Sequence, residues 1–146
     1  MPTLRIQGNE IPYEEKDIIT FPEGLVGLPH LTRMVAVKEA TIEPFIWFAA
    51  VSEDDDVAFV VAEAHSIFPH YEPKLPPDSN MNGLLAENEV PVVLAIVLID
   101  ADWQKSTANL RAPLFISAKT MRGAQVVLND NSFSVAEPLP LAATAA

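Results

Sequence analysis

Cysteine, basic side chains and long apolar runs are scarce or absent in this chain. Its 146 residues include no cysteine, which excludes disulfides and thiolate metal sites and fits a reducing compartment. The longest apolar stretch, residues 90–99, is about half of the roughly 20 residues that a membrane helix needs. The N-terminal residues also lack the apolar segment of a secretion signal. We therefore expect a cytoplasmic protein that does not enter a membrane.

Basic residues are outnumbered, because nine Lys and Arg face twenty Asp and Glu and give a formal net charge of −11. Proteins that bind nucleic acid neutralise phosphates with clustered Lys and Arg, and the sequence shows no such cluster. Direct binding of nucleic acid is therefore not expected. An acidic chain attracts a basic protein partner instead, although a charge of this size also serves solubility alone.

Apolar residues nevertheless make up 49% of the chain, which is enough for a packed core. The length fits one domain, and no internal repeat is visible. We expect a single domain over residues 1–138. The Pro- and Ala-rich end, residues 139–146, has no apolar period and is expected to be frayed.

Short apolar segments recur along the chain with turn residues between them. Many are rich in Val, Ile and Phe, which suit a pleated sheet. Regular spacing of this kind favours an all-β, mainly antiparallel domain, built as a small barrel or as two sheets. The expected strands are residues 3–7, 18–20, 33–38, 45–51, 57–62, 92–99, 114–119, 125–128 and 133–135, with 67–75 as a further extended segment. The runs 45–51 and 92–99 are apolar on both faces, so we expect them to lie centrally.

The thirteen prolines favour the same fold class, because proline cannot continue a helix and is confined in sheets to edges, strand starts and bulges. Only residues 78–89 have a helical pattern. Asp78 or Ser79 suits the N-terminal cap, and Leu84 falls on the apolar face. Gly83 weakens the pattern by about 1 kcal/mol relative to Ala. We expect one short helix near residues 78–89.

The stretch I-I-T-F-P-E-G-L-V-G-L-P-H-L, residues 18–31, places two glycines and two prolines in apolar surroundings. A phosphate-binding loop needs a nearby Lys or the N-terminus of a following helix, and neither is indicated here. Glu23 would also repel phosphate. We expect Gly24 and Gly27 to adopt positive φ in turns, so that the stretch forms a structural corner.

Patterns for catalysis and metal binding are weak. His65 and His70 have a spacing seen in zinc motifs, but such motifs need a second pair of ligands, and His30 is remote in sequence. No G-x-S-x-G motif is present, and Ser66 beside His65 would point to the opposite face of a strand. We expect no enzyme activity, no metal and no cofactor.

Four consecutive acids, Glu53, Asp54, Asp55 and Asp56, lie between two apolar segments. A solvated hairpin turn explains them, since acids are common in turns. An acidic face for a basic protein is a second interpretation. Calcium binding is a third, although the D-x-D-x-D-G pattern is absent.

Three further stretches complete a pattern shared with a known family. They are F-V-V followed by I-F-P-H-Y-E, then T-A-N-L-R-A-P-L-F-I-S, then Q-V-V-L. Together with residues 18–31, and in this order, they make residues 3–138 resemble the flagellar assembly factor FliW family. Leu28, His70 and Ser106 depart from the family pattern, and His70 stands where an acid is frequent.

The resemblance implies a small β-barrel-like fold and a protein that binds proteins. FliW-like proteins bind the translational regulator CsrA and antagonise its repression of flagellin mRNA translation. They also bind flagellin, so that export of flagellin frees them to capture CsrA. The resemblance leaves an alternative open, which is a flagellin-binding, chaperone-like factor with CsrA control secondary.

The resemblance to this family also implies a role for the negative charge, which is attraction of a basic partner. CsrA must be basic because it binds RNA, and an acidic partner would be steered to it. We expect Tyr71 and Glu72, on the proline-rich extended segment, to contact the partner. Glu53, Asp54, Asp55 and Asp56 are expected to support them by their charge.

Overall fold

The computed structural model describes residues 2–51, 57–76, 79, 81, 83–129 and 132–140. The strands within them are β1 (Thr3–Ile6), β2 (Asn9–Pro12), β3 (Ile18–Thr20), β4 (Arg33–Lys38), β5 (Ile46–Ala50), β6 (Ala58–Glu63), β7 (Val92–Leu98), β8 (Thr107–Ser117), β9 (Arg122–Gln125) and β10 (Glu137–Pro138). One short α-helix, α1 (Ala64–Ile67), follows β6 directly. The 3-10 turns η1 (Glu15–Asp17), η2 (Ala40–Ile42) and η3 (Trp103–Lys105) lie between strands.

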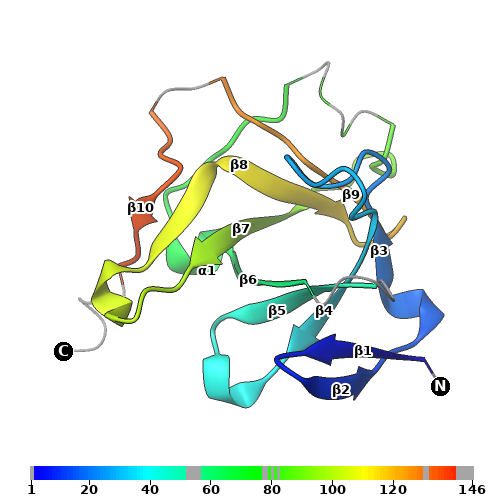
Figure 1. Ribbon diagram of the computed structural model, residues 1–146. Helices are drawn as coiled ribbons and strands as arrows, with labels where there is room; N and C mark the ends of the chain where they lie inside the picture. The colour runs from blue at the N-terminus through cyan, green and yellow to red at the C-terminus, as the bar shows by residue number, and fades with distance from the viewer. Residues whose placement is uncertain are drawn as a thin grey trace.

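Seven strands close into a barrel (Figure 1). In order around it they are β8, β7, β6, β5, β4, β3 and β9, and the pairing of β9 with β8 closes the ring. Neighbouring strands run antiparallel except β3 and β9, which are parallel where Thr20 meets Arg122. β10 pairs with β8 outside the ring. The expected all-β, mainly antiparallel fold is confirmed, and of the two expected arrangements, a small barrel or two sheets, the structure has the barrel.

The barrel interior is filled by side chains that alternate along each strand and therefore share one face of the sheet. Met34, Phe48, Val61 and Leu114 are fully buried there and belong to one apolar cluster. Phe21, from the turn after β3, packs edge-on against Phe48 with ring centroids 5.8 Å apart and planes at 82°. This edge-to-face geometry is the one that aromatic quadrupoles favour.

The outer faces of the barrel strands are covered by two other groups of residues. The hairpin of β1 and β2 places Leu4 and Ile6 over Val35 and Ala49 on the outside of β4 and β5. On the outside of β7 and β8, α1 and the chain after it cover a second cluster that includes Phe115. The runs predicted to be apolar on both faces form β5 and β7, which are paired on both edges and contribute side chains to the interior cluster and to an outer cluster.

The expected short helix exists, but its predicted position near residues 78–89 is wrong. The α-helix spans Ala64–Ile67, and the described residues between 79 and 89 form turns and bends. Gly83 has φ +84° and Asn88 has φ +61°, and both values are incompatible with a right-handed helix. The pattern that suggested a helix therefore belongs to a series of turns in which Leu84 packs into the cluster outside β7 and β8.

The corner at residues 18–31 is structural, as predicted. Gly24 and Gly27 have φ +71° and +78°. Leu25 and Leu28 exchange backbone hydrogen bonds of 3.2 and 2.8 Å around a two-residue turn. Leu25 is buried in the interior cluster, so the corner closes one end of the barrel.

β8 is longer than its apolar run indicates. The pattern predicts residues 114–119, whereas the strand begins at residue 107 and includes a register shift opposite β7. At this shift the Asn109 side-chain oxygen accepts hydrogen bonds of 3.1 Å from the backbone N–H groups of Arg111 and Ala112. Pro113, which has no N–H to donate, sits in the same interruption, where a strand tolerates proline.

Candidate protein-binding surface

The residues expected to contact a partner follow α1 directly. The helix ends where the N–H of Phe68 donates to the carbonyl of Ala64 at 2.7 Å. A second turn forms when the N–H of Tyr71 donates to the carbonyl of Phe68 at 3.0 Å. Pro73 and Pro76 then keep the chain out of helical structure, because proline fixes φ and restricts the residue before it. The segment therefore runs along the outside of the barrel.

Tyr71 points inward from this segment and is 5% exposed. Its hydroxyl donates a hydrogen bond to the carbonyl of Leu110 on β8. Its ring packs edge-on against Phe133 with centroids 5.0 Å apart and planes at 83°. Burial raises the pKa of the Tyr71 hydroxyl above its usual range, so the group stays protonated and remains a donor. Tyr71 thus fixes the segment to β8.

Glu72, the next residue, is exposed. It borders a hollow of about 300 Å³ whose other lining residues are Lys74, Pro76, Leu128, Asn129 and Phe133. Neighbouring residues in an extended chain point to opposite sides, so the buried Tyr71 ring sets the outward direction of the Glu72 carboxylate. The structure therefore gives the two predicted residues different positions, one inside and one at the surface.

The four consecutive acids of the prediction, Glu53, Asp54, Asp55 and Asp56, lie outside the described residues. In the sequence they stand between β5 and β6. Their expected contribution to partner binding stays a prediction.

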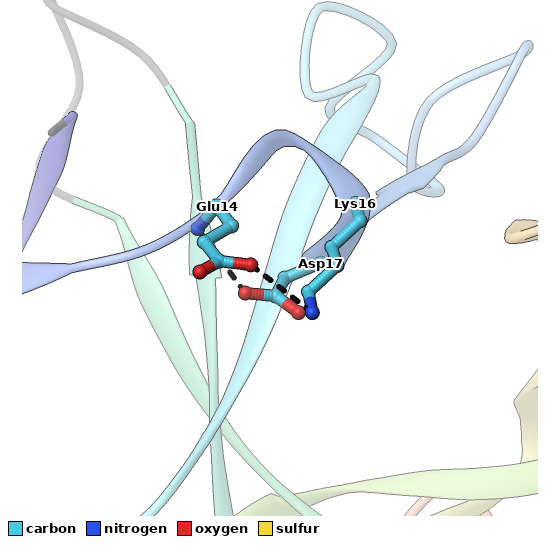
Figure 2. A network of polar contacts seen from close by, with 3 residues as sticks. All are labelled: Glu14, Lys16 and Asp17. Carbon is cyan, nitrogen blue, oxygen red and sulfur yellow. Dashed lines mark hydrogen bonds and ion pairs between the residues drawn. The ribbon is translucent and has the colours of Figure 1, made fainter.

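Acidic side chains also surround basic ones at the turn before β3 (Figure 2). Lys16 lies 3.2 Å from a Glu14 carboxylate oxygen, and Arg33 lies 3.6 Å from Glu15. The Asp17 carboxylate accepts the backbone N–H of Glu14 at 3.1 Å and holds the turn. Exposed ion pairs of this kind contribute little stability, typically about 0–1 kcal/mol. Three exposed acids, Glu14, Glu15 and Asp17, face two exposed bases, Lys16 and Arg33, so this group of side chains carries a net negative charge.

His65 and Ser66 are both exposed on α1. Among the described residues, no group of three or more His, Asp or Glu side chains is placed to hold a metal ion. In the same residues, every buried side-chain N or O atom has a hydrogen-bond partner. No helix in the described ranges has the length and apolar character needed to cross a membrane.

Sequence reasoning missed the residues that complete the hollow beside Glu72. Leu128 and Phe133 fall in segments expected to be strands, but neither lies in a strand of the structure. Leu128 is held because its N–H donates to the carbonyl of Arg111 at 2.8 Å. No spacing in the sequence connects these residues with Glu72, since only the fold brings the two parts of the chain together.

Comparison with known proteins shows the family to which this chain belongs and a solved structure with the same fold. Residues 5–139 match the family described as FliW protein. The "Flagellar assembly factor FliW 2" of Desulfotalea psychrophila is 32% identical over 140 residues, which cover 96% of this chain and 91% of that protein. The "Flagellar assembly factor FliW" of Symbiobacterium thermophilum is 35% identical over 124 residues, covering 84% of this chain and 89% of that protein.

A solved structure has the same fold. It is described as the crystal structure of the flagellar assembly factor FliW and superposes with a TM-score of 0.83. The superposition covers 94% of this chain and 96% of that one at 24% sequence identity. The barrel described above is therefore a known architecture.

Proposed function

This chain belongs to the FliW family, and we propose that it acts as a flagellar assembly factor by binding proteins. Its proposed partners are the translational regulator CsrA and flagellin. While flagellin is abundant in the cytoplasm, the chain is occupied by it; after export of flagellin, the chain binds CsrA and relieves repression of flagellin mRNA. The observation that carries this proposal is the family match over residues 5–139.

The charge of the chain supports a basic partner. Its formal net charge is −11, and the acids at the turn before β3 are exposed beside the basic residues there. Opposite charges accelerate encounter between proteins, and the effect falls with ionic strength. An RNA-binding protein supplies the positive surface that such a chain attracts. An acidic chain bound beside CsrA also disfavours RNA at the same place.

We place the partner contact at Glu72, with Tyr71 as a positioning residue beneath it. The burial of Tyr71 and its hydrogen bond to β8 support this division, because they hold the exposed carboxylate on a fixed segment. The hollow beside Glu72 gives a partner side chain about 300 Å³ of space. A Lys or Arg that enters it would pair with the carboxylate.

Charge reversal tests this placement. Glu72→Lys should weaken binding of purified CsrA or flagellin by roughly tenfold or more, because it replaces attraction by repulsion at the contact. Glu10→Lys is the matched control, since Glu10 is an exposed acid on β2, which covers a different face of the barrel. Both variants change the net charge equally. Equal affinities for the two variants would remove Glu72 from the interface.

A competition experiment tests the function itself. The protein is titrated into a complex of CsrA with flagellin mRNA leader RNA, with and without flagellin. We expect RNA release by the protein alone and less release when flagellin is present. The association rate with CsrA should fall from low to high salt. A protein that binds flagellin but leaves the CsrA–RNA complex intact would instead favour the chaperone-like alternative.

A further inference from the structure

A second surface feature shares no lining residue with the hollow beside Glu72. It is a groove of about 440 Å³ formed by β6, β7, β8 and the chain just before β10. Three of the exposed large apolar side chains of the described residues gather there: Leu98 is 73% exposed, Ile99 is 47% and Val135 is 63%. Phe59 and Val60 also line the groove and are only partly buried. Exposed apolar groups that share one groove are typical of a binding surface.

The groove lies where β6, β7 and β8 are paired with one another and not at a free strand edge. Val97 of β7 pairs with Val60 of β6 on one side and with Ala108 of β8 on the other. Ala108 in turn pairs with Glu137 of β10. The backbone groups at this level are therefore already used in the sheet. An extended peptide that binds through main-chain hydrogen bonds needs an unpaired strand edge, which these paired strands do not provide. A helix can instead pack its apolar face against the exposed side chains.

The charges around the groove favour a basic occupant. The lining residues carry no charge. The chain segments that border it, residues 99–107 and 132–138, contain the acids Asp100, Asp102 and Glu137 and the single base Lys105. A second copy of this chain would bring a further formal charge of −11, so electrostatic repulsion disfavours self-association. A segment with Lys or Arg beside its apolar face is attracted.

We propose that this groove is the docking site for an amphipathic helix of a partner protein. The apolar face of the helix covers Leu98, Ile99 and Val135, and its flanking Lys or Arg side chains face the acids at the rim. Anchors at positions i, i+3, i+4 and i+7 would span the groove. The inference rests on the proposed function in one respect only, which is that the chain binds other proteins.

The first test uses a designed peptide, so that it does not depend on any natural partner. The probe is a fluorescent helical peptide with Leu at i, i+3, i+4 and i+7 and Lys at the remaining surface positions. The control peptide has the same composition in scrambled order and therefore the same charge. We expect the amphipathic peptide to bind the protein at least about tenfold more tightly than the scrambled one in fluorescence anisotropy. Equal binding of both peptides would overturn the proposal.

Protein variants then locate the site. Leu98→Glu and Val135→Glu place a charge in the groove and should each abolish the preference for the amphipathic peptide. Val90→Glu is the matched control, because Val90 is 86% exposed and is not among the groove residues. All three side chains are mostly exposed, so the variants should unfold like wild type in urea. Loss of the preference in Val90→Glu to the same extent would refute the assignment.

The same variants distinguish the groove from the proposed function. If CsrA or flagellin binds wild type and binding weakens roughly tenfold in Leu98→Glu, the groove is used by that partner. If neither protein binds wild type while the amphipathic peptide still requires Leu98, the proposed partners fail and the groove stands. If wild type sediments as a dimer that Leu98→Glu converts to a monomer, a second copy is the occupant and the proposal fails.

Discussion

Gly24 is the position at which one added methyl group tests the corner between β3 and β4 most directly. Its φ of +71° lies in the left-handed region, and a Cβ placed on it would stand 2.4 Å from the carbonyl oxygen of Pro29. The same Cβ would stand 2.6 Å from the Pro29 Cα. Ordinary contacts begin at 3.4 Å, so the backbone at Pro29 would have to move by about 1 Å.

The corner has little freedom to make that movement. The N–H of Gly24 donates to the carbonyl of Phe21 at 2.9 Å, which fixes the entry to the turn. The N–H of Val26 donates to the side-chain oxygen of Gln125 at 2.9 Å, which ties the tip to β9. Gln125 is itself buried and donates to the carbonyl of Ala112 at 3.1 Å. Displacement of the corner therefore disturbs a chain of hydrogen bonds.

Gly27 supplies a matched control within the same corner. Its φ is +78°, but a Cβ there would have no atom within 4 Å. Gly27→Ala should therefore cost only the left-handed conformation, about 1–2 kcal/mol. Gly24→Ala adds an overpacking term of about 1–3 kcal/mol, so its total is about 2–5 kcal/mol.

Urea unfolding followed by tryptophan fluorescence measures both variants. The midpoint should fall in the order wild type, Gly27→Ala, Gly24→Ala, with the slope of the free energy against urea unchanged. Equal losses in the two alanine variants would show that contact with Pro29 is not what requires glycine at position 24. A Gly24→Ala variant as stable as wild type would refute the corner geometry altogether.

Two further changes test the attachment of the covering segments. Tyr71→Phe should lower the free energy of unfolding by about 1–3 kcal/mol in urea, because the carbonyl of Leu110 loses its buried hydrogen bond; no loss would contradict that bond. Glu89→Gln should destabilise most at neutral pH. The Ser117 hydroxyl, and then the N–H of Ala86, lower the pKa of Glu89, so its contribution is present above the ordinary pKa of about 4.3 and is lost as pH falls through the lowered value. Thermal unfolding across that range should show the two proteins converging in acid, and a difference independent of pH would contradict the lowered pKa.

Local sequence pattern was sufficient where a strand carries its own signal. β3 and β4 occupy residues 18–20 and 33–38 as predicted. β5 and β7 are apolar on both faces because the barrel interior covers one face and the outer clusters cover the other. The same signal predicted an all-β domain of paired strands but left a barrel and two sheets as alternatives, because closure depends on the pairing of β9 with β3 and β8.

Elements that form through contacts with another segment, and not through their own composition, could not be predicted. β2 has the sequence N-E-I-P and forms because Ile11 pairs with Leu4 of β1, not because of its composition. β9 has the sequence R-G-A-Q and is a strand because it closes the ring between β3 and β8. Leu139 was expected in a frayed end, yet it is 6% exposed, and its N–H donates to the carbonyl of Ser106 at 3.2 Å. Each of these is held by contacts with another segment of the chain.

The directions of the Tyr71 and Glu72 side chains could not be predicted from the sequence either. Tyr71 and Glu72 are adjacent in a polar, proline-rich stretch that predicts exposure for both. Only the contact with β8 turns the first inward and leaves the second at the surface.

An apolar run alone does not distinguish a covered strand from a docking surface. Val93 and Leu94, after the exposed Val92 that begins β7, are buried under neighbouring segments, whereas Leu98 and Ile99 continue the same run into solvent. The physical difference lies outside the strand, in whether another part of the chain reaches that level of the sheet. The free energy of covering Leu98 and Ile99 is then available to a second polypeptide, at about 25 cal/mol per Å² of apolar surface removed from water. A strand that supports the fold at one end thus offers binding surface at the other.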